Sequence, residues 1–421
     1  MTAPYTSARE SPGAGSGPFF AVFYMEYPLP TAARQYVADH LHDDPAQLAL
    51  QARRYPGLPV PDLVRQIQAR QKARVKIPTW AANPDLVFPP ALSVEQASSD
   101  RTAAFKASLV QGHRLADLTG GFGVDAAHFA TTVTEVQYVE RSAALAEVVR
   151  FNLAQLGIGN VQCHTADAAQ FLRSTPDAFD WIYLDPARRD TAAKKIFRLQ
   201  DCEPDVLRLL PLLLHKSRSV LLKTSPMLDI EQAIQELRQV RRLWVVAVDN
   251  ECKEVLYELG PEPAIDPERY TVNLRRDGTQ QEFRLNRARE SKAVARYAEP
   301  RQFLYEPNVA VLKAGGFKSV GTAFELFKLH QHSHLYTSDT LRTDFPGRKF
   351  RIRAVEKYDG PALRAHLGPE VRANVTTRNF PDTVAEFRHR TSIREGGDLY
   401  LFATTNLEGK LLVLVCEKVT A

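Results

Sequence analysis

Apolar residues recur at helical spacing over residues 31–75, whereas short apolar runs alternate with amphipathic segments from residue 92 onward. In the first region, the spacing within Ala33–Leu41 and again within Val60–Ile67 predicts helices. The proline-bounded segment Pro84–Pro90 breaks this pattern and marks a linker. The later alternation of strand-like and helix-like runs predicts a mostly parallel α/β sheet.

Seven strands are expected in this sheet, with helices between the early ones, for example over Ser142–Leu156. The strands are predicted at Arg114–Leu118, Glu135–Glu140, Val161–Thr165, Trp181–Leu184, Ser219–Lys223, Arg242–Asp249 and Glu254–Leu259. Beyond them, Tyr270–Leu285 has the pattern of a hairpin that turns at Asp277-Gly278. The segment Arg348–Val419 has strand-like runs at both ends and a closing hairpin through Glu408-Gly409.

Length and composition are those of a multi-domain globular protein. The chain has 421 residues, of which 44% are hydrophobic and 24% charged, so more than one core is expected. Its four cysteines form no CxxC pair, which predicts a reducing, cytoplasmic location and no zinc site. The apolar run Phe19–Met25 is too short to span a bilayer. Residues 1–17, rich in Gly, Ser and Pro, are predicted to be a disordered leader rather than a signal peptide.

The positive net charge of +5 lies in the last part of the chain. Residues 301–421 contain 18 Lys and Arg against 13 Asp and Glu, while residues 1–300 contain 36 of each. This placement suits a C-terminal part that binds a polyanion. An ordinary solvated surface explains such a small excess equally well.

The most informative motif is the turn after the first predicted strand, where Asp117 is followed by Gly120, Gly121 and Gly123. Glycines at a strand-to-helix turn allow the backbone to approach a ligand closely. The spacing departs from the G-x-G-x-x-G of dinucleotide sites. A carboxylate at Asp117 would repel a pyrophosphate but favour the ammonium and sulfonium charges of S-adenosylmethionine (SAM), which is therefore the predicted cofactor.

Acidic residues end the next three strands as well. Glu140 is placed to accept the ribose hydroxyls, Asp167 to accept from the adenine amino group, and Asp185 ends the fourth strand in Trp181-Ile-Tyr-Leu-Asp-Pro-Ala-Arg188. In an open α/β sheet these carboxyl ends line one crevice. Each of these acids alone is explained as a helix N-cap. Four acids at the ends of four consecutive strands, together with a glycine turn, predict a SAM site.

This constellation resembles the class I SAM-dependent methyltransferase fold. Together with Leu92–Ala103, Leu222–Met227, Tyr305–Asn308 and His334–Ser338, it is similar to a bacterial methyltransferase family with a ferredoxin-like insert and a C-terminal THUMP-like domain. The resemblance implies a Rossmann-like methyltransferase sheet, an N-terminal helical region and small C-terminal α+β domains. The implied boundaries are 1–17 for the leader, 18–90 for the helical region, 91–290 for the SAM-dependent methyltransferase domain, 298–345 for the ferredoxin-like domain and 348–421 for the THUMP-like domain.

The acceptor side is predicted at Asp185, Pro186 and Arg188. Similar enzymes that methylate nitrogen have Asp/Asn-Pro-Pro-aromatic here, so that the carboxylate grips an amino group and the ring stacks on the base. Ala187 and Arg188 depart from that pattern. Arg188 can stack on a base or pair with a phosphate. RNA uridine methyltransferases with Asp-Pro-Pro-Arg also need a cysteine nucleophile, and no cysteine here lies in an activating motif. Methylation of a nitrogen atom is therefore the preferred prediction.

Further candidate substrate contacts are basic: Arg189, Lys223, Lys349, Arg351 and Arg353. Lys223 ends the fifth strand, where a solvated lysine is the alternative. The last three alternate along one predicted strand and would share a face as a phosphate track. An edge strand that deters aggregation is the alternative for them. The THUMP-like resemblance implies binding to RNA.

Two further motifs have simple alternative explanations. Ser98, Ser99 and Thr102 can cap a helix over the methionine end of the cofactor. His330, His332 and His334 alternate without an acid or cysteine at ligand spacing, so no metal is expected.

The sequence therefore predicts a cytoplasmic SAM-dependent methyltransferase of tRNA or rRNA, without membrane or metal partners. Two alternatives stay open: methylation of a protein or small molecule, or RNA binding with a vestigial cofactor site. Neither the acceptor atom nor the oligomeric state follows from the sequence.

Overall fold

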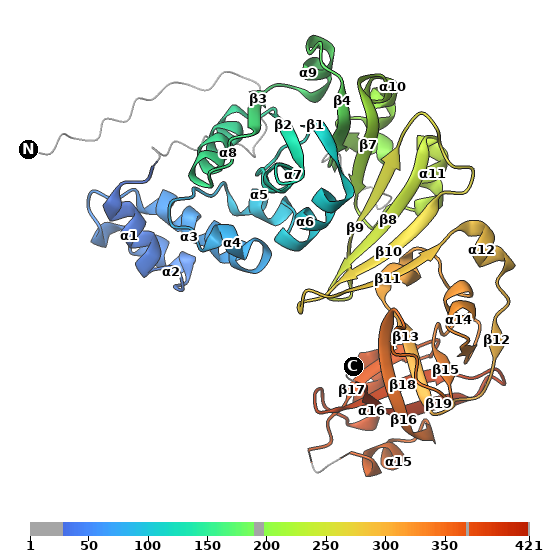
Figure 1. Cartoon of the computed structure of the whole chain (residues 1–421). Helices are drawn as coiled ribbons and strands as arrows, with labels where there is room; N and C mark the ends of the chain where they lie inside the picture. Colours follow the sequence, from blue (N-terminus) through green and yellow to red (C-terminus); the bar gives the residue numbers. More distant parts are fainter. Residues whose placement is uncertain (1–27, 189–197, 368–369, 420–421) are drawn as a thin grey trace, which may run out of the picture.

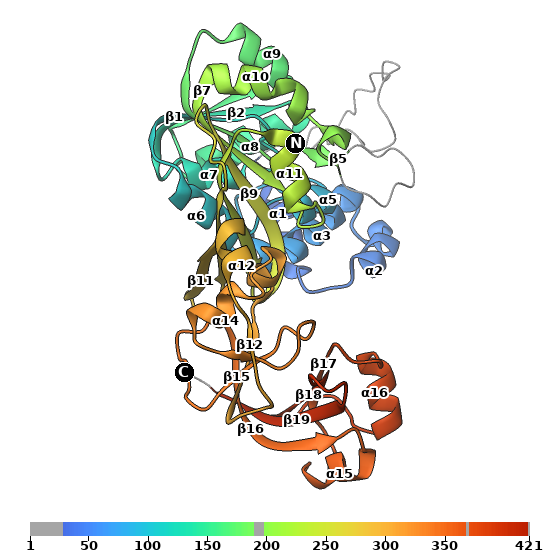
Figure 2. The ribbon, with the colours of Figure 1, turned by 90° about the vertical axis from the view of Figure 1, so that its right-hand side faces the viewer.

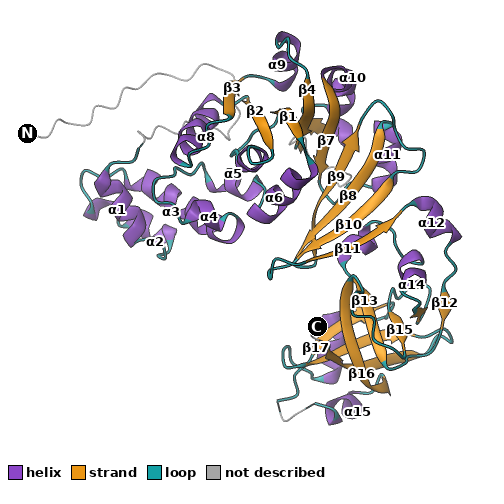
Figure 3. Ribbon diagram, in the orientation of Figure 1, coloured by secondary structure: helices purple, strands orange, loops and turns teal. Residues whose placement is uncertain are grey.

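The computed structural model describes residues 28–188, 198–367 and 370–419. Along the chain, an N-terminal group of helices is followed by a large sheet and then by a smaller curved sheet (Figure 1). The predicted leader, residues 1–17, lies outside the described residues. Figure 3 shows how completely the first part is helical and how the two sheets make up most of the rest.

The N-terminal helices are packed onto one face of the large sheet. They are α1 (Thr31–Asp39), α2 (Pro45–Leu50), the short 3-10 helix η1 (Ala52–Arg54), α3 (Val60–Lys76), α4 (Pro78–Ala81), α5 (Ala91–Gln96) and α6 (Asp100–Leu109). Buried residues of α1 and α3, such as Tyr36 and Ile67, belong to the same hydrophobic core as Leu115 and Val136 of the sheet. The helical region predicted from the sequence therefore shares a core with the sheet that follows it.

The predicted linker is held in place by side chains from both of its neighbours. Gln66 of α3 donates to the backbone oxygen of Phe88 at 2.6 Å and accepts from its nitrogen at 2.9 Å. Asn152 makes the same pair of bonds with Val87, at 2.7 and 2.9 Å. The buried Arg70 donates to four backbone oxygens, those of Ala81, Asn83, Pro84 and Leu86. Because an extended segment has no partners of its own, these side chains satisfy its backbone groups.

The large sheet has nine strands in the order β11-β10-β8-β9-β7-β4-β1-β2-β3. Their bounds are β1 (Gly112–Asp117), β2 (Val133–Glu140), β3 (Val161–Thr165), β4 (Phe179–Leu184), β7 (Ser217–Thr224), β8 (Val240–Val248), β9 (Glu251–Leu259), β10 (Glu268–Leu274) and β11 (Gln280–Leu285). The strands β3-β2-β1-β4-β7 pair in parallel, and β9 is antiparallel between β7 and β8. This confirms the mostly parallel α/β sheet, and β10 and β11 form the predicted hairpin.

Helices cover both faces of this sheet. They are α7 (Val124–Phe129), α8 (Ala143–Gln155), α9 (Ala168–Ser174), α10 (Val206–Lys216) and α11 (Ile230–Leu237), with the 3-10 helix η2 (Leu199–Asp201) before α10. The short helix α12 (Arg287–Lys292) follows the sheet and has no buried residue. A two-stranded ribbon, β5 (Ala187–Arg188) with β6 (Cys202–Glu203), stands apart at the carboxyl ends of the strands. The helix predicted over Ser142–Leu156 is α8, with Ser142 as its N-cap.

The C-terminal part forms one eight-stranded sheet in the order β12-β14-β15-β13-β16-β19-β18-β17. The strands are β12 (Arg296–Tyr297), β13 (Phe303–Pro307), β14 (Phe327–Lys328), β15 (Tyr336–Ser338), β16 (Gly347–Lys357), β17 (Asn374–Arg378), β18 (Leu399–Thr405) and β19 (Leu411–Lys418). The helices are α13 (Val309–Lys313), α14 (Ser319–Ala323), α15 (Gly360–Ala365) and α16 (Val384–Thr391). Figure 2 shows α15 and α16 together beside β16 to β19.

The second sheet curls until strands that are distant in its order meet. Glu306 of β13 is almost fully buried and accepts from Arg348 of β16 at 2.7 Å and from Arg378 of β17 at 3.0 Å. Strand β17 is the far edge of the sheet, so one carboxylate links its edge to its middle. The two small domains predicted on either side of residue 346 therefore share a single sheet.

This sheet is also anchored to the first one. Asn250 of the β8–β9 turn accepts from the backbone nitrogen of Val309 at 3.0 Å, and Arg269 of β10 donates to the backbone oxygen of Ala314 at 3.0 Å. Gln281 of β11 donates to the backbone oxygen of Gly347 at 3.0 Å. Among the described residues, no helix is both long and apolar enough to cross a bilayer.

Candidate active site

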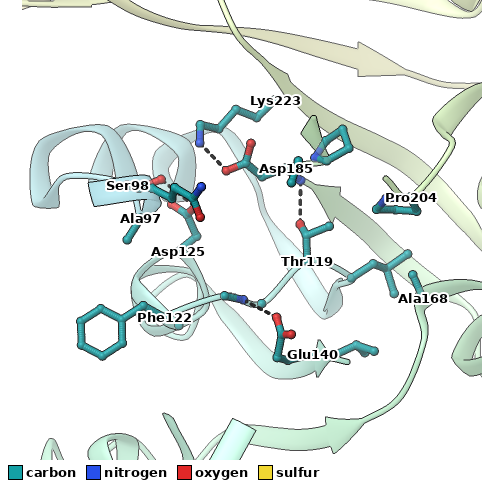
Figure 4. A pocket seen from close by; sticks show the side chains of 18 of the residues that line it. Ala97, Ser98, Thr119, Phe122, Asp125, Glu140, Ala168, Asp185, Pro204 and Lys223 are labelled. Carbon is teal, nitrogen blue, oxygen red and sulfur yellow. Dashed lines mark hydrogen bonds and ion pairs between the residues drawn. The ribbon is translucent and has the colours of Figure 1, made fainter. Parts of the chain in front are cut away.

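A cavity of about 640 Å³ lies at the carboxyl ends of β1, β2, β4 and β7. Its wall contains the glycine turn, the ends of these strands and the loop between α5 and α6. Figure 4 shows side chains from all of these elements pointing toward one space. The carboxyl edge is where open α/β sheets bind ligands, and the volume is in the range of small-molecule sites.

The glycine turn is tied tightly to β2. The backbone nitrogen of Gly121 donates to Glu140 Oε2 at 3.1 Å, and the hydroxyl of the buried Tyr138 donates to the oxygen of Gly121 at 2.7 Å. Gly121 and Gly123 have φ of 53° and 79°, which favours glycine. At Gly120, an added Cβ would lie 2.1 Å from the Tyr138 ring. The turn therefore needs glycine for backbone conformation at two positions and for space at the third.

Replacing Gly120 by alanine is expected to destabilise the fold and weaken cofactor binding together. The methyl group would push on the buried Tyr138 ring, and such overpacking costs about 1–3 kcal/mol. Urea unfolding and ligand calorimetry would measure both effects. Gly159→Ala is the matched control, because its added Cβ meets nothing within 4 Å. Equal stability of the two variants would contradict the close packing described here.

Asp117 lies behind the turn and is absent from the residues that line the cavity. It is 1% exposed, its Oδ1 accepts from the nitrogen of Thr119 at 3.1 Å, and its Oδ2 has no hydrogen-bond partner. Burial, with the nearby charge of Asp125, raises the pKa of Asp117 well above its ordinary value. Its observed contact therefore shapes the turn, and direct contact with a cofactor stays a prediction.

Glu140 and Asp167 both line the cavity, at the ends of β2 and β3. Glu140 Oε1 accepts from the nitrogen of Ser142 at 2.8 Å, in addition to its bond from the glycine turn. Asp167 is the N-cap of α9, where its Oδ1 accepts from Ala169 and Gln170 at 2.9 and 3.1 Å. The capping interpretation of Asp167 is therefore correct, and the same side chain stands in the cavity wall.

Asp185 and Lys223 form an ion pair in the cavity wall. The nitrogen of Asp185 also donates to Thr119 Oγ1 at 2.6 Å, which fixes the end of β4 against the glycine turn. Burial lowers the pKa of Lys223, but the charges of Asp185, Glu254 and Asp125 outweigh it and raise the pKa above its ordinary value. The Lys223 side chain is only 14% exposed. It is a partner of Asp185 rather than a solvated surface lysine.

The other acceptor-side residues lie at the rim. Pro186 and Ala187 line the cavity, as do Glu203 and Pro204 across the ribbon. The backbone of Arg188 pairs with Cys202 in that ribbon. Arg189 lies outside the described residues, so the roles predicted for these two arginines stay predictions.

A buried ionic cluster behind the cavity was missed by the sequence reasoning. Lys106 of α6 is fully buried and donates to both carboxylate oxygens of Glu254 at 3.1 Å and to Ser98 Oγ at 2.9 Å. It also lies 3.2 Å from Asp125 Oδ1. Asp125 and Ser98 reach the cavity surface (Figure 4). The only sequence signal was Asp125, two residues after Gly123, which an ordinary acid in the first turn of a helix explains equally well.

Opposing effects set the pKa values in this cluster. Burial raises the pKa of Asp125, but Lys106, Lys223 and hydrogen bonds from Ser98 and Tyr183 outweigh it, so the net shift is downward. Burial raises the pKa of Glu254, and the charges of the two lysines only partly offset it. The predicted helix-capping role is confirmed for Ser99 and Thr102, which form a capping box at the start of α6, whereas the Ser98 hydroxyl donates to Asp125.

The three basic residues of β16 contact acidic, carbonyl and aromatic groups of the protein, and a register shift between Ile352 and Ala354 interrupts the strand at Arg353, so their shared face stays a prediction. Arg351 pairs opposite Glu417 of β19, and Arg353 donates to the same carboxylate at 2.5 Å. Lys349 donates to the backbone oxygen of Thr343 at 2.5 Å. Arg351 lies over the ring of Phe303, with its guanidinium carbon 4.9 Å from the ring centre. A phosphate track here would have to compete with Glu417.

The three alternating histidines make contacts within the protein. His330 Nδ1 lies 3.0 Å from the side-chain nitrogen of Asn379, and His334 stacks on Phe317. Burial first, with the charges of Lys328 and Arg378, lowers the pKa of His334 to about 4. Within the described ranges, no group of His, Cys, Asp and Glu side chains is arranged to hold a metal ion.

Comparison with known proteins gives family models for the C-terminal part. Residues 303–346 match a ferredoxin-like domain and residues 347–418 a THUMP-like domain. No curated protein sequence matches the chain. Among solved structures, an rRNA methylase from Streptococcus thermophilus is 14% identical, covers 38% of this chain and 94% of its own, and has a TM-score of 0.29. A candidate methyltransferase from Streptococcus mutans, in complex with S-adenosylhomocysteine, is 14% identical over 38% and 96%, with a TM-score of 0.28.

One solved structure matches nearly the whole chain. A candidate methyltransferase from Porphyromonas gingivalis W83 is 31% identical, covers 92% of this chain and 98% of its own, and has a TM-score of 0.82. At this coverage the match includes parts of both sheets. The chain therefore belongs to this bacterial methyltransferase family, in which an α/β methyltransferase sheet precedes a ferredoxin-like and a THUMP-like domain.

Proposed function

We propose that the protein is a SAM-dependent methyltransferase that modifies a base nitrogen in structured RNA. The observation that carries this proposal is that one cavity contains the glycine turn, Glu140 and Asp167 on one side and Asp185 with Lys223 on the other. A cofactor and an acceptor can thus meet in a single space. The family assignment supports methyl transfer as the reaction class.

The residues of the cavity fit SAM. Gly120 and Gly121 line the cavity with backbone alone, and Glu140, at the end of the second strand, can accept from ribose hydroxyls. Asp167 Oδ1 is used by the helix cap, so its other oxygen lies outside those bonds and can accept from an adenine amino group. When bound, SAM supplies a methyl group on a sulfonium. The protein then has to place the acceptor in line with it.

Asp185 is the residue that would hold the acceptor. Its carboxylate is paired with the largely buried Lys223 at the cavity wall, where it can accept a hydrogen bond from an acceptor group. An amino group donating to Asp185 would be oriented for attack and could lose its proton to that carboxylate. Pro186 and Ala187 continue the wall beside it.

The cysteines favour nitrogen over carbon as the acceptor. Attack through a cysteine needs a thiolate near the methyl donor. Burial raises the pKa of Cys252 to about 11, and neither Cys252 nor Cys202 is among the residues that line the cavity.

RNA is the proposed substrate because of the C-terminal part. The THUMP-like match covers residues 347–418, the part of the chain that carries the excess positive charge. Arg351 offers an exposed guanidinium over an aromatic ring, an arrangement that suits contact with bases or phosphates.

The decisive experiment is mass spectrometry of modified nucleosides in tRNA and rRNA from a deletion strain. We expect one base-methylated nucleoside to disappear and to return when the gene is restored. Restoration with an Asp185→Ala variant is the matched control and should fail. An unchanged nucleoside profile, with SAM binding intact, would favour a protein or small-molecule acceptor instead.

A further inference from the structure

We propose that Asp125 binds the α-ammonium group of the methionine part of SAM, and that Ser98 and Lys106 hold its carboxylate in position. This inference rests on the proposed cofactor, and it assigns the methionine end to a residue other than Asp117. Asp125 lies in the first turn of α7, immediately after the glycine turn, and lines the cavity.

One oxygen of the Asp125 carboxylate accepts two hydrogen bonds from the protein, and the other accepts none. Its Oδ2 accepts from Ser98 Oγ at 2.7 Å and from the Tyr183 hydroxyl at 2.9 Å. Its Oδ1 accepts no hydrogen bond and has the Lys106 ammonium 3.2 Å away. The residue as a whole is 9% exposed. The Oδ1 atom itself is covered by protein, and a buried carboxylate oxygen normally accepts a hydrogen bond. The ammonium group of a ligand seated against Asp125 would supply that bond.

The charges around Asp125 favour a cation. Lys106 is shared between two carboxylates, those of Asp125 and Glu254, and a second ammonium, that of the largely buried Lys223, is paired with a third carboxylate, Asp185. Both oxygens of Glu254 accept hydrogen bonds from Lys106, whereas Asp125 Oδ1 accepts none. Buried charge without full compensation is costly. A positive group in the cavity would complete the balance.

The other carboxylates of the cavity wall have different positions or partners. Glu140 and Asp167 stand at the ends of β2 and β3, the proposed ribose and adenine side. Asp185 is paired with Lys223, and Glu203 with Arg141. In Figure 4, Asp125 lies beside Ser98 on the wall formed by the α5–α6 loop and the start of α7, opposite Glu140. The methionine part of SAM would extend toward that wall if its adenosine lay at Glu140 and Asp167.

Calorimetry with three ligands tests this assignment. SAM and S-adenosylhomocysteine carry the α-ammonium, whereas 5′-methylthioadenosine contains the adenosine and the sulfur without the amino-acid part. For Asp125→Asn we expect Kd to rise about 10- to 100-fold for the first two ligands, the range for a hydrogen bond to a charged group. The Kd of 5′-methylthioadenosine should change by less than about threefold.

Two further variants keep the test decisive. Asp167→Asn should weaken all three ligands, because they share the adenosine. Ser98→Ala, which frees Asp125 while keeping its charge, should raise Kd for SAM more than for 5′-methylthioadenosine, and it covers the case in which Asp125→Asn folds poorly. Equal losses for all three ligands in both Asp125→Asn and Ser98→Ala, or no loss in either, would overturn the inference. If the wild-type protein bound none of them, the proposed function itself would fail.

Discussion

Replacing Asp185 by alanine is expected to abolish most methyl transfer while leaving SAM binding nearly intact. The carboxylate is the group placed to orient the acceptor and take its proton, and such general-base residues contribute about 10²- to 10⁴-fold to rate. The measurement is transfer of a labelled methyl group from SAM to RNA isolated from the deletion strain. We expect kcat to fall within that range and the Kd of SAM to change by less than about threefold.

The fold should tolerate the Asp185→Ala change, so a loss of activity can be attributed to the missing carboxylate. Lys223 keeps Glu254 and Asp125 as nearby negative charges after Asp185 is removed. Glu262→Ala is a suitable control, since this glutamate is exposed and does not line the cavity. Activity within about threefold of wild type for Asp185→Ala would show that another group orients the acceptor.

Replacing Lys106 by methionine is expected to cause the largest loss of stability. The change leaves Glu254 and Asp125 buried without their shared cation, and breaking a buried ion pair from one side costs about 3–5 kcal/mol. The free energy of unfolding in urea would measure it. Lys72→Met is the matched control, because Lys72 pairs with Glu95 on the surface at 2.9 Å with its side chain 58% exposed, and such pairs contribute little.

The pH dependence of this loss identifies its cause. The pKa of Asp125 is lowered in the folded protein, so its stabilising contribution is present above its ordinary pKa and disappears as the pH falls through the folded value. In Lys106→Met, protonation relieves the unpaired charges. The difference from wild type should therefore shrink in acid, and adding Glu254→Gln should recover part of it at neutral pH. A deficit that is constant with pH would indicate lost packing instead.

The sheet and most of the candidate site could be predicted from local patterns. The strands β1 to β4 and β7 to β9 lie within about two residues of their expected bounds at most ends, because buried parallel strands are short apolar runs with clear boundaries. The acids at strand ends could be placed in one crevice because topology alone brings carboxyl ends together. Glu140, Asp167 and Asp185 all line the cavity.

What could not be predicted depends on contacts between distant segments. Lys106 and Glu254 are 148 residues apart and each looks like an ordinary charged residue in its own element. Asp117 has the right position in the motif, but packing buries it behind the turn. The ion pair of Lys223 with Asp185 likewise needs the order of β4 and β7 in the sheet. Periodicity carries none of this information.

The carboxylate of Glu306, which is shared by three strands, affects how the protein would position a large substrate. Because it joins β13, β16 and β17, and because Asn250, Arg269 and Gln281 fasten this curled sheet to the first one, the two halves cannot shift independently without breaking these bonds. The span from the C-terminal sheet to Asp185 is then a fixed length. Under the proposed function, an RNA bound at the C-terminal sheet would present to the cavity only a nucleotide at the matching distance.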